Sequence, residues 1–328
     1  MPLAHVALRT TDRDAATDVS PPRIGLVASR MHREHPQGAL LRLVSAIEIR
    51  LRDDFPVEFV VVGQTFDALQ AAGLLRGHPS LRRLPTRREG GIIHLVAGVV
   101  DNAGDDALDA VIYLLDPDDP TSVFPEGLAL KRECVIHGKP FISTYAHARE
   151  WFELERIARG AAPDPALDPW FDLQSQTVAL VAHDALKPKM LDFAKEHFAL
   201  LSRFARRIGT GTTGGLLNEL AASRLPESAA ATAWVDRYLS GPLGGDAQIA
   251  REILLGRCGR VIFFEDPHVA RQHEADIQLL ERSARIRGDA TMCVSDPKGA
   301  ARWAVLVARR AAMVTPRGDV EAADPPAT

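Results

Sequence analysis

Four short polar segments in the second half of the chain carry residue types suited to acid-base chemistry on a phosphorylated ligand. In residues 240–246, glycines flank a turn that brings the carboxylate of Asp246 to the start of a segment with helical periodicity. A carboxylate held in this way can act as a general base. The other segments are Val181–Asp184 followed by Lys187, Thr210–Gly215, and Asp266–Pro267 followed by His273 and Asp276. Together they supply a base, an anion-binding loop and proton-transferring side chains, which predicts an active site.

The threonine- and glycine-rich segment Thr210–Gly214 has the composition of a phosphate-binding loop. It follows a short apolar run and precedes a segment with helical periodicity. Backbone N–H groups at the start of a helix bind phosphate, and threonine hydroxyls add further donors. Lys187 adds a full positive charge. The structural alternatives are an ordinary glycine-containing turn and a solvent-exposed lysine like its neighbour Lys189.

The polar residues also admit two plainer interpretations. Asp246 could be only the N-cap of the helix that follows it, a position that aspartate commonly fills. The acids and histidines could instead bind a divalent metal; this set is His183, Asp184, Asp266, His268, His273 and Asp276. Their spacing matches no standard zinc pattern, and the three cysteines lie elsewhere in the sequence. We therefore expect no metal.

The elements that must position these residues follow a simple alternation. Short apolar runs that end in Gly, Asp or Thr alternate along the chain with segments in which apolar residues recur at helical spacing. This pattern predicts an α/β fold in which helices cover both faces of a mostly parallel sheet. Ligands bind at the carboxyl ends of the strands of such sheets. All four polar segments stand at predicted strand ends.

The same series of sequence blocks occurs twice. Ile24–Ala28, Phe59–Thr65, Gly90–Gly91 and Val111–Pro117 correspond in order to Val178–Ala182, Arg207–Thr213, Gly244–Gly245 and Val261–Pro267. Such recurrence predicts two tandem domains with the same fold. We expect a disordered lead-in at residues 1–20, a first domain at 21–153, a linker at 154–175, a second domain at 176–314 and a disordered tail at 315–328.

Length and composition fit a two-domain protein of a reducing compartment. The 328 residues suffice for two domains of about 150 residues each. A formal net charge of −4 gives no electrostatic reason to expect nucleic acid or an acidic membrane surface. The three cysteines are odd in number and far apart, which is no disulfide framework. Apolar runs such as 95–100 are too short to span a bilayer. We predict a cytoplasmic protein with no nucleic-acid or membrane partner.

At these residues the second half, about 176–312, resembles methylglyoxal synthase. This enzyme converts dihydroxyacetone phosphate to methylglyoxal and inorganic phosphate. The resemblance rests on four motifs in order, namely Val-Ala-His-Asp with a lysine on the next turn, Thr-Gly-Thr-Thr-Gly, Ser-Gly-Pro-x-Gly-Gly-Asp-x-Gln, and Phe-Phe-x-Asp-Pro with His and Asp downstream. Each motif alone is weak, whereas four in order are specific.

The resemblance implies a carbon–oxygen lyase that needs neither metal nor cofactor. Its substrate would be a phosphorylated triose, with inorganic phosphate as the product and as a candidate inhibitor. The family usually forms homohexamers, so we expect a homo-oligomer, and a trimer of two-domain chains would present six domains. The same fold also serves as a regulatory module in other enzymes, and fold does not settle activity. The alternative is therefore a non-catalytic regulatory protein that binds a phosphorylated metabolite.

The resemblance also assigns roles to individual residues. Asp246 would take a proton from the carbon next to the ketone, and His183 would polarise the carbonyl. His273 would donate to or shuttle protons from the substrate oxygens, with Asp276 orienting it or relaying the proton. The full catalytic set is Asp246, His273, Asp276, His183, Asp184 and Asp266, the last two in supporting roles. The implied substrate-binding residues are His183, Lys187, Thr210, Gly211, Thr212, Thr213, Ser240, Gly241 and His273.

The first half lacks this chemistry at the corresponding positions. The replacements are Ser29 and Arg30 for His183 and Asp184, Val62 for Thr210, Phe66 for Gly214, Ile92 for Asp246, and Val123 and Glu126 for His273 and Asp276. An isoleucine cannot take a proton, so we expect this half to be a degenerate packing partner. The second half departs from the family at Glu265, where an aromatic residue is common, and in an extra stretch near 224–237.

Overall fold

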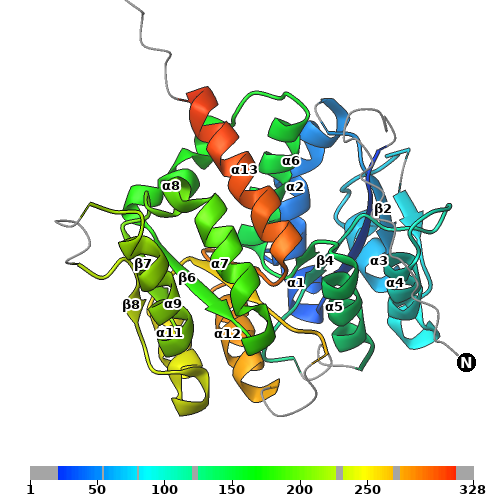
Figure 1. The fold of residues 1–328 in the computed structure, drawn as a ribbon. Helices are drawn as coiled ribbons and strands as arrows, with labels where there is room; N and C mark the ends of the chain where they lie inside the picture. The colour runs from blue at the N-terminus through cyan, green and yellow to red at the C-terminus, as the bar shows by residue number, and fades with distance from the viewer. Residues whose placement is uncertain are drawn as a thin grey trace, which may run out of the picture.

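The computed structural model describes residues 21–53, 55–79, 81–119, 125–226, 232–268 and 274–314, apart from the side chains at 52–53 and 274–278. The predicted lead-in at 1–20 and tail at 315–328 lie outside the described residues, as do His273 and Val123. Within them the chain forms two five-stranded sheets in which every strand pair is parallel, with helices on both faces (Figure 1). The predicted α/β class and the tandem arrangement are confirmed.

The first half builds a sheet with the strand order β3-β2-β1-β4-β5. Its strands are β1 (Arg23–Ala28), β2 (Glu58–Val61), β3 (Leu81–Arg83), β4 (Ala110–Leu114) and β5 (Phe141–Ile142). Its helices are α1 (Arg30–Glu34), α2 (Ala39–Asp53), α3 (Gly63–Ala71), α4 (Gly91–Val100), α5 (Pro125–His137) and α6 (Tyr145–Ala158).

The second half repeats the same topology, with the order β10-β9-β6-β7-β8. Its strands are β6 (Thr177–Ala182), β7 (Arg206–Gly209), β8 (Asp236–Arg237), β9 (Arg260–Phe264) and β10 (Met292–Val294). Its helices are α7 (Lys187–Glu196), α8 (Phe198–Leu201), α9 (Gly211–Ala222), α11 (Gly245–Leu254), α12 (Glu274–Ile286) and α13 (Pro297–Val314). In both halves the first strand is central, and each sequence block occupies the same place as its counterpart.

Both faces of each sheet are covered because successive strand residues point to opposite sides. On β6, Val178 and Leu180 are buried in a cluster with residues of α7, α9 and α13. Ala179 and Val181 are buried in a second cluster with residues of α11 and α12. The fully apolar strands that the sequence shows are therefore those of a parallel sheet buried on both faces.

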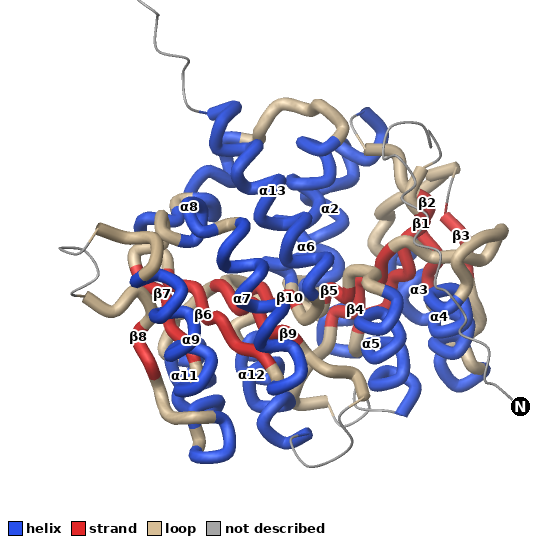
Figure 2. Tube along the Cα trace, viewed as in Figure 1, coloured by secondary structure: helices blue, strands red, loops and turns tan. Residues whose placement is uncertain are grey.

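The two sheets meet at their edge strands β5 and β10, which lie next to each other in the middle of Figure 2. The Thr144 hydroxyl donates to the Thr291 carbonyl at 2.7 Å, and the Ala146 N–H donates to the Gly288 carbonyl at 2.8 Å. Helix α6 of the first half packs on α13 of the second. The halves therefore share a continuous buried junction.

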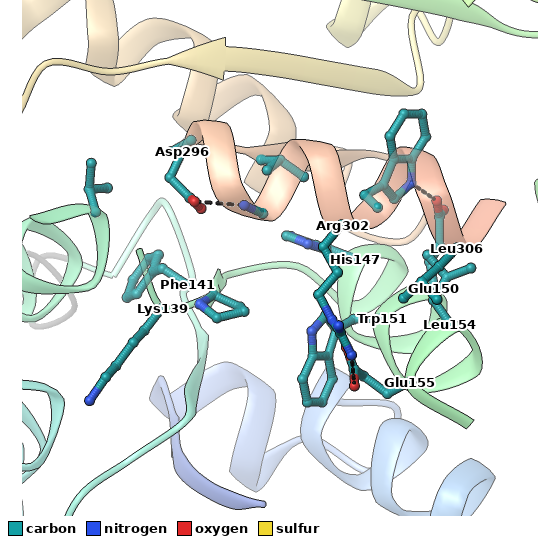
Figure 3. A pocket seen from close by; sticks show the side chains of 16 residues that line it. Lys139, Phe141, His147, Glu150, Trp151, Leu154, Glu155, Asp296, Arg302 and Leu306 are labelled. Atoms are coloured by element: carbon teal, nitrogen blue, oxygen red, sulfur yellow. Dashed lines mark hydrogen bonds and ion pairs between the residues drawn. The ribbon is translucent and has the colours of Figure 1, made fainter. Parts of the chain in front are cut away.

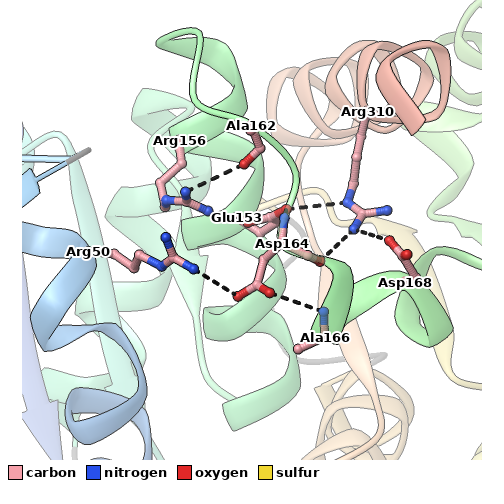
Figure 4. A network of polar contacts seen from close by, with 8 residues as sticks. All are labelled: Arg50, Glu153, Arg156, Ala162, Asp164, Ala166, Asp168 and Arg310. Atoms are coloured by element: carbon pink, nitrogen blue, oxygen red, sulfur yellow. Dashed lines mark hydrogen bonds and ion pairs between the residues drawn. The ribbon is translucent and has the colours of Figure 1, made fainter.

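Buried charges at this junction are paired. Glu150 of α6 accepts from the Trp303 indole N–H at 2.7 Å (Figure 3). The same carboxylate lies 2.8 Å from the Arg260 guanidinium. Glu153 holds Arg156 at 2.7 Å and Arg310 at 3.4 Å (Figure 4). Unpaired charges would be costly at such depth, whereas paired ones fix how α6 and α13 fit together.

Among the described helices, none combines the length and the apolar character needed to cross a membrane.

Candidate active site

The four polar segments lie at one edge of the second sheet. They follow β9, β6, β7 and β8, which are neighbours in that sheet. Because all the strands are parallel, their carboxyl ends point the same way, and the loops that leave them face a common space. The sheet thus gathers residues that are far apart in the sequence.

His183 follows β6 directly, and its ring is fixed by the neighbouring loop. Its Nδ1 accepts the backbone N–H of Asp266 at 2.9 Å, and its ring stands edge-on to Phe263 with centroids 5.0 Å apart. With Nδ1 as an acceptor, the neutral imidazole carries its proton on Nε2, which is then a donor. The first half keeps this contact in a smaller form, since the Ser29 hydroxyl accepts the Asp116 N–H at 3.0 Å.

Lys187 is held at the edge of the site. Its ammonium lies 2.5 Å from Asp184 Oδ1, and its side chain is only 19% exposed whereas that of Asp184 is 94% exposed. Lys189, two residues further along the same helix, is exposed. The structure thus pairs Asp184 with the lysine and places the backbone of Asp266 against His183.

The threonine loop joins β7 to α9, with Thr210 directly before the first helical residue, Gly211. Thr210 and Thr213 are buried, with their hydroxyl oxygens 3.4 Å apart, and Thr212 is exposed. The Gly211 N–H donates to the Leu239 carbonyl at 2.9 Å. A Cβ at Gly211 would lie 3.0 Å from the nitrogen of Ser240, so this glycine allows the two loops to approach.

Asp246 stands in the first turn of α11 and beside the Ser240–Gly241 turn. Helix α11 begins at Gly245, and its N-cap is Gly244, which has a φ of 94°. The N-cap alternative for Asp246 is therefore wrong, because a left-handed backbone at the cap favours glycine there. A Cβ at Gly241 would lie 2.7 Å from Asp246 Oδ2, so the carboxylate rests against that glycine.

The fourth segment is described only in part. Asp276 belongs to the first turn of α12, and its side chain lies outside the described residues, as does the whole of His273. Within the described part of the chain, no group of three or more His, Cys, Asp or Glu side chains is arranged to hold a metal ion.

Three residues that the sequence did not single out contact these loops. Arg237 donates through Nε to the Gly211 carbonyl at 3.1 Å, and Lys131 of the first half forms an ion pair with Glu265. Arg132 donates through Nε to the Pro267 carbonyl at 3.2 Å. Arg237 has no motif to mark it, and nothing in the sequence relates α5 to the loop after β9. The one signal in the sequence was Glu265, which stands where an aromatic residue is common in the family.

The matching edge of the first sheet is built differently. Ile92, the counterpart of Asp246, is buried in the apolar core. Arg33, the counterpart of Lys187, donates to the Ala28 carbonyl at 3.1 Å. A cleft of about 900 Å³ borders this edge, where Arg42 lies 2.5 Å from Asp289 and 4.4 Å from the ring centre of Tyr145. Arg33 and Arg42 are thus both paired with groups of the protein.

The fold is an α/β domain whose loops gather a lysine, hydroxyls, an acid and an oriented histidine at the carboxyl edge of a parallel sheet, the edge at which such sheets bind ligands. A comparison with models of protein families gave no match. A solved structure of methylglyoxal synthase from Elizabethkingia anophelis is 32% identical, covers 40% of this chain and 78% of that chain, and has a TM-score of 0.32.

Sequence relatives are more informative. Methylglyoxal synthase of Thermus thermophilus is 39% identical over 113 residues, 34% of this chain and 81% of that protein. Methylglyoxal synthase of Agrobacterium fabrum is 42% identical over 109 residues, 33% of this chain and 78% of the relative. Methylglyoxal synthase of Pseudoalteromonas atlantica is 45% identical over 107 residues, which are 33% of this chain and 71% of the relative. The chain belongs to the methylglyoxal synthase family, and each aligned stretch is about a third of it.

Proposed function

We propose that this protein is a methylglyoxal synthase whose chemistry is carried by the second half, residues 176–314. The substrate would be dihydroxyacetone phosphate and the products methylglyoxal and inorganic phosphate. The observation that carries the proposal is the convergence of Asp246, His183 and Lys187 with the threonine loop at the ends of the three adjacent strands β6, β7 and β8. Family membership supplies the reaction class, and the first half would be the degenerate partner.

The proposed reaction begins with proton abstraction by the Asp246 carboxylate from the hydroxyl-bearing carbon next to the ketone, on the side away from the phosphate ester. The electron pair moves onto the carbonyl oxygen and forms an enediolate. His183, which has its donor on Nε2, would stabilise the charge on that oxygen. His273 and Asp276 would move the remaining protons between the substrate oxygens.

The enediolate then expels phosphate, and geometry decides this outcome. When the carbon–oxygen bond to phosphate lies out of the enediolate plane, the electron pair flows into it and the bond breaks. In the plane, elimination is disfavoured and isomerisation competes. Lys187, the threonine loop and the Ser240–Gly241 turn would hold the phosphate in the productive orientation and take up its charge as it leaves. The resulting enol rearranges to methylglyoxal.

The test is to incubate the purified protein with dihydroxyacetone phosphate in the presence of a chelator and to follow methylglyoxal and phosphate together. The matched variant is Asp246→Asn, which keeps the size of the side chain and removes the base. We expect equal release of both products by the wild type, and a loss of about 10²-fold to 10⁴-fold in kcat in the variant.

Different outcomes would assign another function. Phosphate release alone, lost on chelation, would indicate a metal-dependent phosphatase. Saturable binding of the substrate without turnover would support the non-catalytic regulatory protein. That function needs the phosphate-binding loops and has no use for the base, so Asp246→Asn would then leave binding unchanged.

A further inference from the structure

We propose that the first half positions the catalytic histidine of the second half, with Lys131 of α5 as the positioning residue. This inference rests on the proposed function, because it gives the half without catalytic residues a part in the reaction. Lys131 touches no substrate; it acts through the loop that follows β9, residues 265–268.

The anchor of this loop is a buried charge cluster between the halves. The Lys131 ammonium contacts Glu265 Oε2 and lies 2.5 Å from Glu281 Oε1. These three side chains are 8%, 14% and 9% exposed in that order. Arg285 lies 3.0 Å from the other oxygen of Glu281, which balances two positive charges against two negative ones.

Lys131 is charged in this setting. Burial acts to lower its pKa, but Glu281 and Glu265 outweigh burial and hold the pKa above its ordinary value. Burial raises the pKa of Glu265, whereas for Glu281 the charges of Lys131 and Arg285 overcome burial and lower it. Removing the lysine would therefore leave Glu265 buried without its cation and Glu281 with Arg285 alone, which is strongly unfavourable.

The anchored loop in turn holds the histidine. Glu265 is fixed by Lys131, and the Pro267 carbonyl accepts from Arg132 at 3.2 Å. Asp266 lies between these two fixed residues, and its N–H donates to His183 Nδ1 at 2.9 Å. Two neighbouring residues of α5 thus hold the Glu265 side chain and the Pro267 carbonyl, on either side of the amide that sets the ring orientation and tautomer of His183.

The two halves differ in how each contacts the loop of the other, after β4 and after β9. Arg282 of α12 contacts the Pro117 carbonyl and lies 2.7 Å from Asp118, which mirrors the contact of Arg132 with Pro267. The counterpart of Glu265 in the first half is the apolar Leu115. The pair Arg282–Asp118 is exposed, whereas Lys131 and Glu265 are buried. Among the described residues the buried charge pair is therefore present at the loop next to His183 and absent from its counterpart, which gives a physical reason for the departure from the family at position 265.

The experiment compares Lys131→Met with the control Lys139→Met. Lys139 lies in the same half, and its ammonium donates to the Asp101 carbonyl at 2.8 Å, away from the loop that follows β9. Steady-state kinetics with dihydroxyacetone phosphate are measured together with the ¹⁵N resonances of His183, assigned with His183→Gln. We expect Lys131→Met to lower kcat about ten- to a hundred-fold, with KM within about twofold, because the phosphate loops are untouched. The Nδ1 resonance should move toward that of a free imidazole, and Lys139→Met should match the wild type.

Unchanged kcat and unchanged His183 resonances in a folded Lys131→Met protein would overturn the proposal. A lower kcat with wild-type His183 resonances would also overturn it, because Lys131 would then only stabilise the fold. If Lys131→Met does not fold, Lys131→Met with Glu281→Gln replaces it, since the remaining Glu265 can bind a proton. If the wild type shows no turnover, the proposed function fails, and the His183 resonances alone decide the positioning role.

Discussion

At the residue scale, the proposed chemistry would depend on a few side chains that are held by backbone groups. His183 is oriented by an amide, and Asp246 rests against Gly241, whose missing side chain leaves room for the carboxylate. Lys187 is partly buried against Asp184, whereas Lys189 on the same helix is exposed. A difference in burial between two lysines of one turn separates a candidate phosphate ligand from an ordinary surface cation.

This contrast gives a test of the phosphate site. We expect Lys187→Met to lower kcat/KM for dihydroxyacetone phosphate by about ten- to a hundred-fold, because a charge-assisted contact to phosphate is lost. Inhibition by inorganic phosphate should weaken in parallel. Lys189→Met should leave both kcat/KM and the inhibition constant of inorganic phosphate within about twofold of the wild type. Equal effects of the two substitutions would show that general charge, rather than a site, is responsible.

At the element scale, glycines set how closely the loops approach. Gly245 begins α11, and a Cβ there would lie 1.8 Å from the Leu239 carbonyl oxygen. Gly215 lies inside α9, where the nearest atom to an added Cβ is the Arg237 guanidinium carbon at 3.6 Å. A close backbone contact therefore requires glycine at position 245, whereas no such contact requires it at position 215.

We therefore expect Gly245→Ala to lower the free energy of unfolding by about 2 to 3 kcal/mol, because the backbone of residue 239 must shift. Gly215→Ala should change it by less than about 1 kcal/mol, since alanine favours the helix and meets no close atom. Urea denaturation of the two variants measures the difference. A neutral Gly245→Ala would mean that the start of α11 is not in close contact with the Leu239 carbonyl.

At the scale of the whole molecule, the two halves behave as one structure because α6 and α13 share a buried junction. His147 of α6 lines a small cavity of about 40 Å³ there, together with Glu150 and Arg302 (Figure 3). Burial lowers the pKa of His147 to about 4 from 6.5, and the nearby charge of Arg260 acts in the same direction. The folded protein therefore keeps this imidazole neutral where the unfolded chain would protonate it.

This shift predicts a pH dependence of stability. Between pH 6.5 and 4 the unfolded state binds more protons than the folded state, so the contribution of His147 is present above pH 6.5 and is lost as the pH falls toward 4. The loss amounts to about 3 kcal/mol. Denaturation curves for the wild type and His147→Gln should diverge by that amount across this interval. Parallel curves would show that His147 is not buried as a neutral group.

The sequence by itself determined the candidate chemical groups and the repeated architecture. Apolar runs closed by Gly, Asp or Thr specified parallel strands, and the order of blocks specified two copies of one topology, because periodicity and turn composition act over a few residues. Motif spacing likewise brought Asp246, His183 and the threonine loop to strand ends. The tertiary structure decided which groups meet across long separations. That Gly244 rather than Asp246 caps α11 depends on a backbone angle, and the tie from Lys131 to Glu265 depends on how two sheets pack. Such contacts bury charges 134 residues apart, and no local pattern encodes their pairing.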